Sequence, residues 1–190
     1  MYQEQAERLY RNTTPYGGVA LDNHCIRLAE FALALGRHNR VPLEEDLVRA
    51  VCWVHDIGLM VKLGGEPAYP HRGLSFISSM IDDWGLSPER RRVVEEMMLF
   101  NHALLPVAGL TPQAEMLRRS VQVEHSLGLR RHGLGAPAVR GMFARWPRAG
   151  LTRILVDFAR ITLMEDGPRQ LLPIFFPSDR SLAMARGRQV

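Results

Sequence analysis

Histidine is the residue type in this sequence whose distribution points most directly to chemistry. The chain contains seven histidines, and His55 is followed directly by Asp56. An imidazole beside a carboxylate is a donor set that suits divalent transition metals such as Zn, Mn, Fe, Co or Ni. Neighbouring helix residues point about 100° apart, so two short side chains at a helix end can still reach one ion between them. The dipeptide therefore predicts a metal site.

Three further histidines lie on separate segments that we expect to be helical. His24 lies in the apolar segment before the His55-Asp56 dipeptide, and consecutive helices usually pack as neighbours. His71 follows a loop rich in Gly and Pro, and His102 lies near the end of the next long helical segment. Helix bundles build metal sites from inward side chains on facing helices. This pattern makes His24 the natural third ligand and leaves the other two as candidates.

The segments around these histidines carry a family resemblance. They read N-H-C-I-R-L-A-E-F-A, W-V-H-D-I-G-L, H-R-G-L-S-F-I and L-F-N-H-A-L-L in chain order. In this order they resemble the HD-domain superfamily of metal-dependent phosphohydrolases, over about residues 20–128. The resemblance implies an all-α bundle of roughly six to eight helices that holds one or two metal ions. His24, His55 and Asp56 would bind metal, and His71 and His102 would bind a second metal or a phosphate.

One position departs from the family pattern. The family usually completes its ligand set with an aspartate on a later helix, and Val121 stands at the corresponding place here. Valine cannot bind a metal. Three alternatives follow: Glu124 reaches the ion with its longer side chain, the metal has one ligand fewer, or activity is lost. Asp157, on a later segment, is a weaker candidate than Glu124.

The resemblance also implies a reaction, with a phosphomonoester or phosphodiester such as a nucleotide as substrate. A bound metal lowers the pKa of water and polarises a phosphoryl oxygen. Asp56 would act as ligand and base, and His71 or His102 would stabilise charge or protonate the leaving oxygen. Two alternatives remain open: a di-iron oxygenase of the HD type, and a binding module without catalysis.

Three basic residues are candidates for binding the substrate phosphate. Arg27 lies one turn after His24 and would share its helix face, and a guanidinium matches phosphate oxygens in a bidentate way. Lys62 and Arg72 flank the loop beside the predicted site. We interpret the three remaining histidines as surface residues; they are His38, His125 and His132.

The elements that must position these residues are helices. Apolar residues recur at helical spacing, and strand-like alternation is scarce. Ser87-Pro88 and Thr111-Pro112 each place an N-cap residue before a proline at the first helical position. Gly58 stands where a helix stop is expected. We predict helices over 20–39, 43–58, 71–84, 88–105, 112–129, 136–146 and 151–165, with a loop over 59–70.

Length and composition fit one globular domain over residues 1–190. We expect the ligand-bearing core at about 20–128 and a C-terminal helical extension at about 136–175. The chain has 190 residues and a net charge of +4, with its arginines spread along the sequence, which makes nucleic acid an unlikely partner. No apolar run approaches the roughly 18 residues of a membrane span. The two cysteines, Cys25 and Cys52, form no C-x-x-C motif, which fits a reducing compartment, so we expect a cytoplasmic protein without a membrane partner. The resemblance implies a small phosphorylated molecule as substrate, with a homodimer possible.

Overall fold

The computed structural model describes residues 1–190 apart from 15–17, 62–67, 166 and 178–190. All regular secondary structure in the described residues is helical, and these residues contain no strand, as predicted. Ten α-helices and one short 3-10 helix (η1) are found there, rather than the six to eight expected. Their bounds are α1 (Tyr2–Thr13), α2 (Gly18–Asn39), α3 (Glu45–Val54), η1 (Ile57–Leu59), α4 (Tyr69–Phe76), α5 (Ser78–Asp83), α6 (Pro88–Phe100), α7 (Pro112–His125), α8 (Ala136–Arg145), α9 (Leu151–Glu165) and α10 (Pro168–Phe175).

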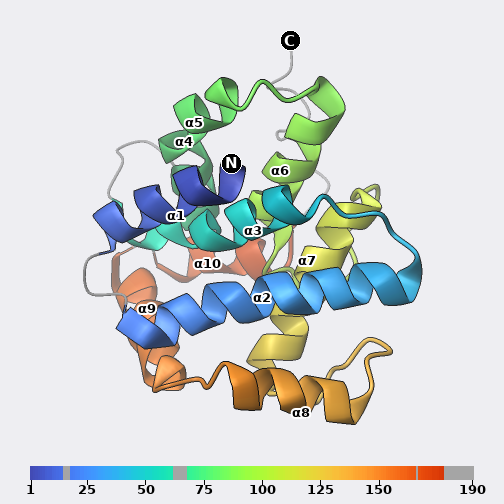
Figure 1. Cartoon of the computed structure of the whole chain (residues 1–190). Coiled ribbons are helices and arrows are strands. Elements are labelled where there is room, and N and C mark those ends of the chain that lie inside the picture. Colours follow the sequence, from blue (N-terminus) through green and yellow to red (C-terminus); the bar gives the residue numbers. More distant parts are fainter. Residues whose placement is uncertain (15–17, 62–67, 166, 178–190) are drawn as a thin grey trace.

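The longest helix, α2, organises the bundle (Figure 1). It packs against α3 on one side and α7 on another, while α1 covers α3 and α6 packs on α7. The main apolar core lies between these helices and includes Leu28, Val51, Met97 and Leu117, each at most 1% exposed. α4 packs against η1 and α6. These contacts bring the segments of the four candidate histidines to the same part of the molecule.

The predicted N-caps are confirmed. Ser87 accepts a hydrogen bond from the amide of Arg90, and Thr111 accepts one from the amide of Ala114. Each proline then occupies the first turn, where a missing N–H costs nothing.

Several predicted boundaries were wrong. The segment 71–84 is two helices that meet at Ile77, and the helix predicted over 88–105 ends at Phe100, so His102 lies just beyond it. α1 was not predicted, and α10 lies within the predicted C-terminal helical extension but was not predicted as a separate helix. The N-terminal sequence is mixed and charged and shows no clear helical pattern, although α1 forms there and packs on α3. Prolines argue against a helix near the C-terminus, although α10 forms there and contains Pro173. The C-terminal residues 178–190 lie outside the described part of the chain.

Contrary to the prediction, Gly58 does not end a helix; it allows close packing of α4 instead. α3 already ends at Val54, and Gly58 lies within η1. A Cβ atom at this position would be 1.8 Å from the carbonyl oxygen of Tyr69 and 2.7 Å from the amide nitrogen of Gly73. Only glycine therefore lets α4 pack this closely against the turn that carries His55 and Asp56.

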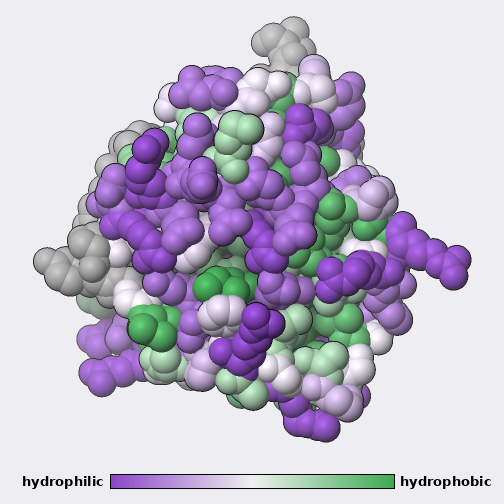
Figure 2. Space-filling model, viewed as in Figure 1, coloured by the Kyte–Doolittle hydropathy of each residue, from purple (hydrophilic) through white to green (hydrophobic). Residues whose placement is uncertain are grey.

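Hydrophilic side chains cover most of the face seen in Figure 2, and hydrophobic ones appear as separate patches. No helix in the described part of the chain is long and apolar enough to cross a membrane.

Candidate metal centre

Asp56 lies at the centre of a cluster of imidazoles. One carboxylate oxygen, Oδ2, is 3.0 Å from His55 Nε2 and 3.9 Å from His24 Nε2. The other, Oδ1, is 3.1 Å from His102 Nε2. His24 and His55 are each only 1% exposed, and the Asp56 side chain is 16% exposed. The fold thus brings together His24, His55, Asp56 and His102.

The local structure fixes which nitrogen His55 offers. Its Nδ1 lies 2.8 Å from the carbonyl oxygen of Cys52, one turn back in α3. A carbonyl only accepts hydrogen bonds, so Nδ1 carries a proton and donates it. This leaves the lone pair of Nε2 directed at the Asp56 side of the cluster, and the same arrangement orients metal-bound histidines in other proteins.

The separations between these atoms fit one ion. Two ligand atoms that each lie about 2.1 Å from a metal are about 3.0 Å apart at an angle of 90° and about 3.9 Å apart at 135°. The separations from His55 and His24 to Asp56 Oδ2 have these values. His24, His55 and Asp56 place one candidate ligand atom each within 4.8 Å of one another.

Buried atoms in this cluster lack hydrogen bonds. His24 Nε2, His55 Nε2 and Glu124 Oε2 are buried and hydrogen-bond to no described residue. Buried polar atoms are nearly always paired, and an exception calls for a missing partner such as an ion. The donor set, its spacing and these three atoms fit a divalent transition metal.

The electrostatics also favour a cation. Burial by itself would lower the pKa of His24, but the carboxylates of Asp56 and Glu124 outweigh it and raise the pKa to about 8. Burial would raise the pKa of Asp56, but the neighbouring His55 and His102 hold it well below its usual value. Asp56 is therefore a carboxylate at neutral pH, which is the form that binds metal.

Glu124 lies next to His24, but its Oε1 atom already forms ion pairs with two arginine side chains. Oε1 is 2.6 Å from Arg27 Nη2, 3.1 Å from Arg148 Nη1 and 3.5 Å from His24 Nδ1. Burial would raise the pKa of Glu124, whereas His24, His125 and Arg27 lower it strongly. His24 Nδ1 is buried and hydrogen-bonds to no described residue, so Oε1 of Glu124 approaches this ring without a hydrogen bond, while His24 Nε2 faces Asp56.

Arg27 has a structural role in the protein interior and not the predicted contact with a substrate phosphate. The residue is fully buried. Its guanidinium donates to Glu124 and to the carbonyl oxygens of Trp146 and Pro147, at 2.6 Å and 3.1 Å for the two carbonyls. Because its donors point into the protein, Arg27 ties the α8–α9 connection to α2 and has no route to a substrate in solution.

The remaining predicted residues lie around the cluster or outside the description. His71 is half-buried in the first turn of α4 and belongs to neither described group of candidate ligands. Arg72 donates to the carbonyl oxygen of Gly58 over 3.4 Å, and Lys62 lies outside the described residues. Asp157 is exposed on α9. Tyr69, which sequence reasoning missed, has its ring 6.0 Å from that of His102, and burial together with the nearby Asp56 carboxylate raises the pKa of its phenol.

Of the three histidines interpreted as surface residues, His125 is only partly exposed and also lies against the cluster. His38 is exposed, and His132 contacts Gln122 at 2.9 Å. The side chain of His125 is 32% exposed, yet its Nε2 is 3.7 Å from Glu124 Oε2 and its ring lies beside those of His24 and His102. Its spacing of four residues from Val121 is the signal that could have found it, because residues four apart share a helix face.

A cavity of about 260 Å³ adjoins the cluster. Two imidazoles of the cluster line it, so the site has a face accessible to a small molecule. Its walls are formed by His102, Leu104, Val121, Gln122, His125, Ser126, Arg130 and Phe175. Arg130 is exposed and brings a positive charge to this cavity.

No protein-family model matches this chain, and no curated protein matches it.

Proposed function

We propose that this protein is a metal-dependent hydrolase of the HD-domain type that acts on a small phosphate ester. The observation that carries the proposal is the set of ligand atoms from His24, His55 and Asp56. The Nε2 atoms of His55 and His24 lie 3.0 Å and 3.9 Å from Asp56 Oδ2, which fits one divalent ion, and both Nε2 atoms are buried without a hydrogen-bond partner among the described residues. The order of these residues also resembles the HD family.

In the proposed reaction, the residues of the cluster would have the following roles. His24, His55 and Asp56 would hold the ion, which when bound supplies a Lewis acid for a phosphoryl oxygen and lowers the pKa of water. Asp56 would accept the proton that the attacking water gives up. His102, which contacts Asp56 at 3.1 Å and lines the cavity, would give a proton to the leaving oxygen.

Arg130 replaces Arg27 as the proposed anchor of the substrate phosphate. It lines the cavity next to His102, and its guanidinium can pair with phosphate oxygens in a bidentate way. A cavity of about 260 Å³ among the described residues suits a small phosphorylated molecule.

The first test is the metal content of the purified protein by elemental mass spectrometry, before and after reconstitution with Mn, Co, Ni, Zn or Fe(II). We expect one or two ions per chain, and their loss in His55→Ala. Loaded protein is then assayed against phosphomonoesters and phosphodiesters, including nucleotides. Full phosphatase activity in both His55→Ala and Asp56→Asn would overturn the proposal. An iron-specific visible spectrum without phosphatase activity would point instead to dioxygen chemistry.

A further inference from the structure

His125 is one turn beyond Val121 on α7. Residues four apart lie on the same helix face, and both side chains line the cavity that His102 also borders. A ligand lost at Val121 can therefore be supplied from His125 without a change in the direction of approach. The residue reaches the cluster from the solvent side, since a third of its side chain is exposed.

The imidazoles form a closed ring around the cluster. Centroids of neighbouring rings are 5.2 Å apart for His24 and His55, 6.1 Å for His55 and His102, 5.4 Å for His102 and His125, and 5.8 Å for His125 and His24. The centroid of a metal-bound imidazole lies about 3.2 Å from the ion, so two such rings on one ion are about 4.5 Å to 6.4 Å apart. Each of these four neighbouring pairs falls in this range.

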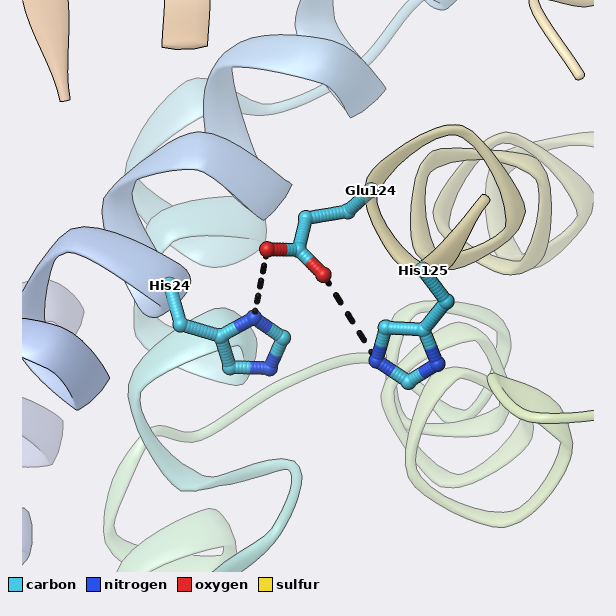
Figure 3. Close-up of side chains that lie close together, drawn as sticks. All are labelled: His24, Glu124 and His125. Atoms are coloured by element: carbon cyan, nitrogen blue, oxygen red, sulfur yellow. Dashed lines mark ion pairs between the residues drawn. The ribbon is translucent and has the colours of Figure 1, made fainter. Parts of the chain in front are cut away.

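Glu124 provides an independent observation that points to an ion beside His125. Figure 3 shows His24 and His125 on either side of the Glu124 carboxylate, each with a ring nitrogen turned toward it. Glu124 is fully buried, and its Oε2, the atom nearest His125, hydrogen-bonds to no described residue. His24, Glu124 and His125 place candidate ligand atoms within 4.8 Å of one another.

We propose that His125, through Nε2, is a protein ligand of the metal ion that His24 helps to hold, in place of the carboxylate that Val121 cannot supply. The inference rests on the metal centre of the proposed function. Glu124 then acts as a positioning residue: Oε1 is held by Arg27 and Arg148 and lies 3.5 Å from His24 Nδ1, while Oε2 lies 3.7 Å from His125 Nε2.

The test is a Co²⁺ titration of the full chain, read by the visible absorption of bound cobalt. The variants are wild type, His125→Ala and His55→Ala, with His38→Ala as the matched control because His38 is an exposed histidine far from the cluster. Replacing an outer-shell partner typically weakens binding by 10–100-fold, so we expect His125→Ala, which removes a direct ligand, to weaken it by at least about 100-fold. The cobalt spectrum should change with it. His38→Ala should match the wild type.

Exogenous imidazole gives a second readout that a structural role would not produce. The cavity beside His125 can admit imidazole, so adding it to Co²⁺-loaded His125→Ala should restore the wild-type spectrum. If His125→Ala binds Co²⁺ with the wild-type affinity and spectrum while His55→Ala has lost binding, the inference about His125 is wrong and the metal centre stands. If the wild type itself binds no Co²⁺, the metal centre and the inference both fail.

Discussion

The buried ion pair between Glu124 and Arg27 gives the sharpest prediction for the stability of the site. Both residues are fully buried, and the pair is short at 2.6 Å. Glu124→Gln keeps the shape of the side chain but removes its charge. Arg27 then stays buried with no carboxylate, and Arg148, only 18% exposed, loses the same partner.

The expected cost follows from this burial. Removing one partner of a buried pair typically costs about 3–5 kcal/mol, because the remaining charge is left in a medium that solvates it poorly. Arg27 retains the carbonyl oxygens of Trp146 and Pro147, which offsets part of that loss. We therefore expect Glu124→Gln to lower the free energy of unfolding by about 3 kcal/mol. For comparison, Glu45→Gln should change it by less than about 1 kcal/mol, since the carboxylate of the Glu45–Arg49 pair is 65% exposed.

Urea denaturation of metal-free protein, followed by circular dichroism, measures both changes. A double-mutant cycle with Arg27→Met isolates the interaction between the two side chains. The double variant should be less destabilised than the sum of the singles, because Arg27→Met removes the charge that Glu124→Gln leaves unpaired. Additive effects within about 0.5 kcal/mol, or a Glu124→Gln midpoint equal to that of the wild type, would refute this reasoning.

Three further predictions concern the elements around the site. Gly58→Ala should destabilise the fold by at least about 2 kcal/mol in urea, because the new methyl group would overlap the carbonyl of Tyr69, whereas Gly141→Ala, in open space within α8, should be neutral or stabilising. Tyr69→Phe should weaken Co²⁺ binding by about tenfold in the same titration, because the phenol beside the Asp56 carboxylate is lost; an unchanged affinity would rule out that role. Asp46 accepts hydrogen bonds from the first amides of α1, which hold its pKa below the usual 3.8 against the effect of burial. Its contribution is present above that value and is lost as the pH falls through the lower folded-state pKa, so Asp46→Asn should cost about 1 kcal/mol at pH 7 and progressively less below pH 4, as measured by thermal unfolding.

Local patterns in the sequence were enough to predict the helical class and most of the helices around the site. Helical periodicity and the Ser87-Pro88 and Thr111-Pro112 caps depend only on residues within a turn of one another, which is why the cap predictions hold. The same is true of the His55-Asp56 turn, where the Nδ1 contact to Cys52 is made within one helix end. His24 was predicted in the site because consecutive helices pack as neighbours, and His102 because helix bundles build metal sites from facing helices.

The tertiary structure alone decided which polar side chains of α2 and α7 share the interior. In the sequence, nothing distinguishes Arg27 and His125 from arginines and histidines that are exposed. Only the packing of α7 on α2 buries Glu124 between them. That packing converts Arg27 from a predicted phosphate contact into the partner of a buried carboxylate and brings His125 to the cluster. Contacts between residues about 100 positions apart depend on how whole helices cross, and no local spacing records that geometry.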